Sequence, residues 1–136
     1  MDQAHPNRTV LIVEDDAELR DLTAALLEDE QLDTVKCESA EAALAVMLLH
    51  EYDISMIFAD VRLTGAMDGV DLAWEVRQRW PTLPVVLTSG QPCERARELP
   101  SGVAYVSKPW QPLNILLLAE QALAFDRGGQ SRSRFP

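Results

Sequence analysis

The chain has 136 residues, which suits a single domain, and 47% of them are hydrophobic, enough to bury a core. Its formal net charge of -10 opposes binding to nucleic acid and to anionic membrane surfaces, because both carry negative charge. The N-terminus has no apolar signal core, and no apolar run reaches the roughly 18 residues that a membrane span requires. We therefore expect a cytoplasmic protein without nucleic acid or membrane partners.

The first half of the chain alternates buried strands with helices. Short apolar runs predict three strands, at residues 9–13, 32–37 and 54–59. Leucines at helical spacing predict a first helix that ends near residue 30. Ser39 then suits the N-cap of a second helix over residues 40–50.

The same alternation continues in the second half of the chain. A glycine-containing loop after Asp60 leads to a predicted helix over residues 70–79, which Pro81 stops. Further strands are predicted at residues 83–87 and 103–106. A short helix within residues 92–99 and a last helix over residues 112–125 complete the pattern.

Strict alternation of strands and helices predicts an α/β fold. Five strands and five helices in this order imply a doubly wound five-stranded parallel sheet with right-handed crossovers. We expect residues 9–126 to form this domain, residues 1–8 to be an N-terminal extension, and residues 127–136 to be a flexible C-terminal tail.

Polar residues stand where four predicted strands end. They are Asp15 and Asp16 after the first strand, Asp60 after the third, Thr88 after the fourth and Lys108 after the fifth. A single aspartate at such a position is most simply a turn or N-cap residue. The carboxyl ends of parallel strands meet at one edge of a sheet, so the whole set predicts a site in one crevice.

These motifs resemble the receiver domain of bacterial two-component response regulators, which has flavodoxin-like topology. The resemblance covers roughly residues 9–125 and rests on motifs in matching order: Val13-Glu14-Asp15-Asp16, Asp60, Thr88-Ser89 and Tyr105-Val106-Ser107-Lys108-Pro109. It implies that the Lys108-Pro109 peptide bond is cis.

The resemblance also implies a Mg2+ site. Clustered carboxylates repel one another unless a hard cation neutralises them, and magnesium prefers oxygen ligands. By analogy with receivers, Asp16 and Asp60 bind the metal directly, Asp15 acts through water, and the backbone carbonyl of Arg62 is a further ligand.

A phosphoryl group on Asp60 is the central expectation from this family. Asp60 takes it from a phosphohistidine, with Lys108 balancing the charge and the Thr88 hydroxyl bonding a phosphoryl oxygen. Tyr105 is the candidate switch residue, with plain packing as the alternative. The protein would not be a conventional enzyme, although it accepts phosphate and can lose it again.

Three features depart from the family pattern. Thr64 stands where receivers usually have proline, and the loop that follows has one extra residue. Arg62 occupies a position that influences access of water to the acyl phosphate. The fourth helix, a region that transmits the switch in many receivers, is short.

The partners that we expect are proteins. The phosphodonor is a sensor histidine kinase or a histidine phosphotransfer protein, and a downstream protein target receives the signal by direct contact, without an output domain. The last helix is apolar almost all round, and its surplus apolar residues predict either a homodimer or partner surface, or deeper burial under loops. Leu116, Leu118, Ala122 and Phe125 are the candidates for that surplus.

Three alternatives stay open at this stage. A receiver-like regulator acting without phosphorylation would not need the complete acidic set. A small doubly wound phosphatase would need a second aspartate where this chain has Arg62. A flavodoxin-like cofactor binder would need a phosphate-cradling loop where the chain has three acidic residues.

Overall fold

A computed structural model describes residues 9–90, 94–111, 113–115, 117–118 and 120–121. The expected extension over residues 1–8, the expected tail over residues 127–136 and parts of the last helix lie outside the described residues. The strands form one sheet in the order β2-β1-β3-β4-β5, and all paired neighbours run parallel. The predicted α/β class and doubly wound parallel sheet are confirmed.

The elements follow the predicted order closely. The strands are β1 (Thr9–Val13), β2 (Asp33–Cys37), β3 (Met56–Asp60), β4 (Val85–Ser89) and β5 (Val103–Ser107). The α-helices are α1 (Ala17–Asp29), α2 (Ala40–His50) and α3 (Gly69–Arg79), and the short 3-10 helices are η1 (Glu51–Asp53) and η2 (Glu94–Glu98). The described residues at 113–115, 117–118 and 120–121 are helical and belong to the predicted last helix.

Three predicted elements differ from the structure. Strand β3 begins two residues later than predicted, at Met56, and ends one residue later, at Asp60. Strand β4 lies two residues later than predicted and therefore includes Thr88; Pro84 stays outside it, although its carbonyl still accepts a bond from the Ile57 amide. The predicted fourth α-helix is the 3-10 helix η2, so the described residues contain four α-helical segments instead of five. The prolines and glycines around it, such as Pro100 and Gly102, leave too short a stretch for an α-helix.

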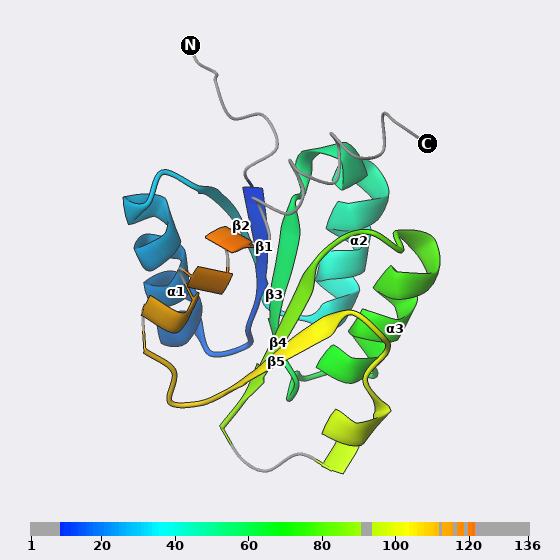
Figure 1. Ribbon diagram of the computed structural model, residues 1–136. Coiled ribbons are helices and arrows are strands. Elements are labelled where there is room, and N and C mark those ends of the chain that lie inside the picture. The colour runs from blue at the N-terminus through cyan, green and yellow to red at the C-terminus, as the bar shows by residue number, and fades with distance from the viewer. Residues whose placement is uncertain (1–8, 91–93, 112, 116, 119, 122–136) are drawn as a thin grey trace.

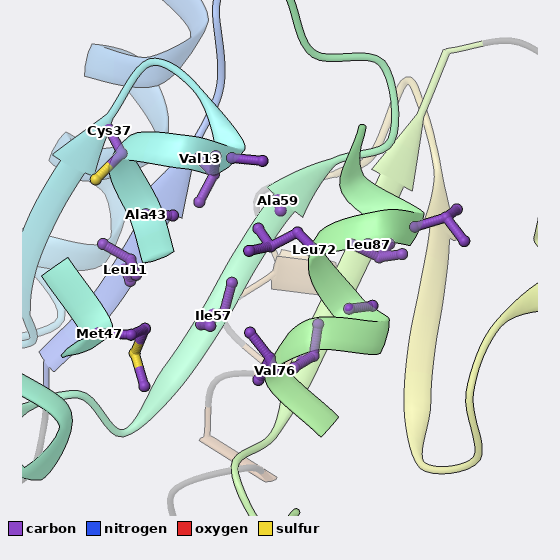
Figure 2. Close-up of a cluster of buried hydrophobic side chains, with 14 of the residues drawn as sticks. Leu11, Val13, Cys37, Ala43, Met47, Ile57, Ala59, Leu72, Val76 and Leu87 are labelled. Carbon is purple, nitrogen blue, oxygen red and sulfur yellow. The ribbon is translucent and has the colours of Figure 1, made fainter. Parts of the chain in front are cut away.

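Helices cover both faces of the sheet (Figure 1). On one face, α2 and α3 pack on a cluster that includes Leu11, Ile57 and Leu87, and Figure 2 shows these side chains between the sheet and the two helices. On the other face, a second cluster includes Phe58 and joins α1 to Ile115 of the last helix. Burial on both faces explains why the central strands β1, β3 and β4 are apolar up to the polar residues at their ends.

Polar caps set where the helices begin. The Ser39 side chain accepts a hydrogen bond from the Ala42 amide, as predicted for the N-cap of α2. Asp68 and Asp71 form a reciprocal capping box at the start of α3. Among the residues described, no helix has the length and apolar character needed to cross a membrane.

Candidate functional site

The centre of the site is the carboxylate of Asp60, the last residue of β3. Asp60 is paired with Thr88 of β4 in the parallel register, so the two residues lie side by side at the carboxyl edge of the sheet. Its side chain is almost buried, and its Oδ1 accepts a hydrogen bond of 3.1 Å from the Arg62 amide. A carboxylate held in this way has a fixed orientation toward the crevice.

Lys108 reaches Asp60 from the end of β5. Its Nζ lies 2.7 Å from Asp60 Oδ2 and 3.4 Å from Glu14 Oε1, and its backbone amide donates to the Ser89 carbonyl at 2.7 Å. Burial disfavours the charged ammonium, but the hydrogen bond and charge of Asp60 outweigh it, so the pKa of Lys108 is raised. Lys108 therefore stays charged beside Asp60. The Lys108-Pro109 bond is cis, as expected.

Glu14 is a site residue that the sequence reading missed. It follows β1 directly, continues the strand pairing through its amide bond to the Cys37 carbonyl, and is 6% exposed. Burial raises the pKa of Glu14 to about 7; the charge of Asp60 adds to this, and the bonds from the Asp16 amide and Lys108 oppose it only in part. Its position as the first acidic residue after a buried strand was the available signal.

The structure gives Asp16 a role at the start of α1 that the sequence did not predict, and its role as a metal ligand stays a prediction. Its Oδ1 accepts bonds from the Glu18 amide at 3.0 Å and the Leu19 amide at 3.2 Å, so its carboxylate is the N-cap of α1. The structure does not bring this side chain to Lys108. Asp15 is exposed beside it. Glu14, and not Asp16, accompanies Asp60 in the crevice.

The Thr88 hydroxyl is buried without a hydrogen-bond partner. Thr88 is 2% exposed, and its Oγ1 has no partner among the described residues. Burying an unpaired hydroxyl is unfavourable, so such a group calls for an explanation. Its place next to Asp60 is the one predicted for a hydroxyl that contacts an added group on that carboxylate.

The remaining predicted residues are near the site but have other surroundings. Arg62 offers its amide to Asp60 while its side chain is exposed; the role of its carbonyl stays a prediction. Tyr105 is half-buried in β5, pairs with Leu87 and packs on the cluster under α3. The predicted rotamer switch of Tyr105 likewise stays a prediction.

The carboxylates and Lys108 determine whether a cation fits here. Within the described part of the chain, no three His, Cys, Asp or Glu side chains are arranged to hold a metal ion. Instead, the ammonium of Lys108 contacts both Glu14 and Asp60. Two buried carboxylates share this one cation, and Asp15 follows Glu14 in the chain. The donor set is all oxygen and carries excess negative charge, which suits a hard divalent cation.

An apolar pocket of about 520 Å³ adjoins the site. Its lining consists of Leu19, Leu22 and Leu26 from α1 with Gly90, Lys108, Pro109 and Trp110. Trp110 also meets Phe58 edge-to-face, with ring centroids 6.0 Å apart. Lys108 thus connects the charged crevice to an apolar surface.

Comparison with known proteins agrees with this geometry. The sequence model of the response regulator receiver domain matches residues 10–120. The chain is 39% identical to the response regulator protein FleR of Pseudomonas aeruginosa over 84% of its own length and 24% of FleR, and it covers only about a quarter of several other curated relatives. It is 34% identical to an uncharacterised 14.6 kDa protein of Leptolyngbya boryana, across 85% of this chain and 91% of that protein.

Solved structures lead to the same family. The crystal structure of the receiver domain of NtrX from Brucella abortus superposes with a TM-score of 0.73 at 31% identity, covering 85% of this chain and 98% of that one. A receiver domain from Clostridium thermocellum, at 17% identity and a TM-score of 0.79, shares the fold. The protein belongs to the response regulator receiver domain family.

Proposed function

We propose that the protein accepts a phosphoryl group on Asp60 from a phosphohistidine and signals by protein contact. The observation that supports this best is the pairing of Asp60 and Lys108 at 2.7 Å, directly beside the buried and unpaired Thr88 hydroxyl. The arrangement has a nucleophile, a fixed cation and a hydroxyl donor that has no partner among the described residues.

In the proposed transfer, an oxygen of Asp60 attacks the phosphorus of the donor. The new O–P bond forms as the P–N bond to the donor imidazole breaks, and the imidazole leaves. Lys108 neutralises charge on the phosphoryl oxygens, and the Thr88 hydroxyl donates to one of them. The Arg62 amide keeps the carboxylate oriented for attack.

Mg2+ is the cofactor that we propose for this site. Asp60, Glu14, Asp15 and the Arg62 carbonyl are the groups that would hold it, with Glu14 replacing Asp16 of the sequence-based set. The bound ion would supply positive charge to the phosphoryl oxygens. Lys108 alone leaves one of the two buried carboxylates uncompensated, and this excess favours a cation.

We propose a sensor histidine kinase or a histidine phosphotransfer protein as the donor, in the cytoplasm. The apolar pocket between α1 and Trp110 suits the apolar side chains of such a partner, because Lys108 lines it and leads to Asp60. We propose that the receiver itself contacts its target. Its signal then passes to a protein target.

The last helix supports a homodimer or target surface only in part. Ile115 is buried and Leu118 packs against the sheet, so Leu118 is not available as surplus apolar surface. Leu113 and Leu117, at 61% and 49% exposed, are the apolar residues that this helix presents. Leu116, Ala122 and Phe125 lie outside the described side chains.

Intact-mass measurement after incubation with acetyl phosphate and Mg2+ tests the proposed function. We expect one added phosphoryl group in the wild-type protein and none in Asp60→Asn. Asp53→Asn, an exposed aspartate away from the site, is the matched control and should be modified like wild type. A wild-type mass that stays unchanged with acetyl phosphate and with a phosphohistidine donor would refute it. If beryllofluoride causes no Mg2+-dependent spectral change in the protein, this result would favour a regulator that acts without phosphorylation.

A further inference from the structure

The loop between β3 and α3, residues 61–68, is held from outside by the carboxylate of Glu41. Glu41 lies in the first turn of α2. Its Oε2 accepts hydrogen bonds from the backbone amides of Ala66 and Met67, both at 3.1 Å. Throughout the described structure, no other side chain bonds to the backbone of residues 63–67. Two amides from one loop therefore converge on a single carboxylate oxygen.

Gly65 brings the backbone against this carboxylate. It has a φ of +104°, which L residues rarely adopt, and a Cβ at this position would lie 2.9 Å from Glu41 Oε1. The loop therefore follows a course that needs glycine and leaves no space between chain and carboxylate. This close fit distinguishes the contact from a chance surface pair.

Both ends of the same loop are held at the end of β3, by Asp60 and by Val61. At its start, the Arg62 amide bonds to Asp60 Oδ1. At its end, the Gly69 amide bonds to the Val61 carbonyl at 2.8 Å, and a Cβ on Gly69 would lie 2.3 Å from the Asp60 carbonyl oxygen. The middle of the loop has no such link to Asp60, so Glu41 supplies its fixed point.

We propose that Glu41 is a positioning residue for this phosphoacceptor loop. It fixes the course of residues 62–67 and thereby keeps the Arg62 carbonyl in place for Mg2+, an inference that rests on the proposed function. The loop has Thr64 in place of the proline usual in receivers, and one extra residue. Glu41 provides from α2 the constraint that the loop sequence itself lacks.

The chemistry of the contact predicts graded effects for two substitutions. A carboxylate that accepts two amide bonds makes charge-assisted hydrogen bonds, which are stronger than neutral ones. Glu41→Ala removes the acceptor and frees both amides. Glu41→Gln keeps one acceptor oxygen in the same place, so it should restore most of the loop order despite the lost charge.

Two experiments on the intact chain test the proposal. One measures amide hydrogen exchange in the absence of metal, and the other measures Mg2+ affinity by titration. Glu38→Ala is the matched control, because Glu38 is an exposed glutamate just before α2 and bonds to nothing in the loop. The Ala66 and Met67 amides should exchange at least about tenfold faster in Glu41→Ala than in Glu38→Ala. Mg2+ affinity, read from tryptophan fluorescence, should fall by about tenfold, as is typical when a residue that orients a metal ligand is removed.

Phosphorylation separates positioning from a general loss of structure. With acetyl phosphate, Glu41→Ala should react slowly at limiting Mg2+ and approach the wild-type rate at saturating Mg2+, while Glu41→Gln stays near wild type at both. Gly65→Ala, which displaces the carboxylate from the other side, should weaken Mg2+ binding in the same direction.

Two results would overturn the proposal. One is that Glu41→Ala binds Mg2+ with the same affinity as the control variant Glu38→Ala. The other is weakened binding that Glu41→Gln does not restore. If wild type itself binds no Mg2+ and takes no phosphoryl group, the proposed function fails instead, which the same titration shows directly.

Discussion

Glu14 gives the sharpest test of the electrostatics of the site, because its contribution to the stability of the folded protein depends on pH. The folded protein raises the pKa of Glu14 from an ordinary 4.5 to about 7, chiefly by burial. The folded state therefore binds its proton more tightly than the unfolded chain does. The contribution of Glu14 to stability is most favourable below pH 4.5 and is lost as the pH rises through 7.

The size of this effect follows from the two pKa values. A rise from 4.5 to about 7 corresponds to a loss on the order of 3 kcal/mol between pH 4 and pH 8. Glu14→Gln keeps the shape and removes the charge. Without metal, the variant should match wild type near pH 4 and should be more stable by up to about 3 kcal/mol at pH 8.

Urea unfolding in a chelator, followed by circular dichroism at several pH values, measures this difference. Glu38→Gln, an exposed glutamate, serves as the control and should track wild type. Millimolar Mg2+ should stabilise wild type and narrow the gap, since a ligand stabilises the folded state that binds it. A Glu14→Gln variant that is less stable than wild type at pH 8, or that keeps a constant offset across the pH range, would refute the reasoning.

Three further predictions test the surroundings of the site. Thr88→Val removes a buried hydroxyl that has no hydrogen-bond partner among the described residues. It should stabilise the unphosphorylated protein by about 1 kcal/mol in urea unfolding and should slow phosphorylation. A loss of stability would show that the hydroxyl does make a hydrogen bond. Gly69→Ala should destabilise the protein by about 1–3 kcal/mol, because the added Cβ meets the Asp60 carbonyl. Gly90→Ala should be tolerated, because a Cβ there would lie 3.6 Å from its nearest contact, Lys108 Cδ. Equal melting temperatures for the two variants would contradict this. Arg95 joins η2 to the capping box of α3 through Asp68 and Asp71. Arg95→Gln should therefore lower the free energy of unfolding by no more than about 1 kcal/mol and should speed amide exchange in the first turn of α3. Unchanged exchange there would show that the ion pairs do not order this turn.

The tie between η2 and α3 gives the short fourth segment a defined place. Arg95 lies 2.7 Å from Asp68 and 3.1 Å from Asp71, and the Trp74 indole donates to the Glu98 carbonyl. Asp68 ends the loop that begins at Asp60. The segment after β4 is therefore connected to the loop after β3 through half-buried ion pairs, which salt screens in part.

Much of the fold could be predicted because local patterns and tertiary packing agree. Parallel strands buried on both faces must be apolar throughout, so β1 and β3 are visible as continuous runs. Ser39 was recognised as an N-cap from its chemistry alone. The predicted start of β4 is two residues too early because Leu83 and Pro84 are apolar. Apolar character alone does not reveal that proline has no N–H to donate to the hydrogen bonds between strands.

The sequence by itself determined the parallel sheet and placed Asp60, Thr88 and Lys108 at one edge, because strand ends in such a sheet must converge. Only the tertiary structure decided which of three consecutive acidic residues enters the crevice. Glu14, Asp15 and Asp16 offer the same carboxylate chemistry in sequence, but β1 ends so that Glu14 is buried against Lys108, and α1 begins so that Asp16 caps it. Which carboxylate loses its water depends on that geometry and not on residue type.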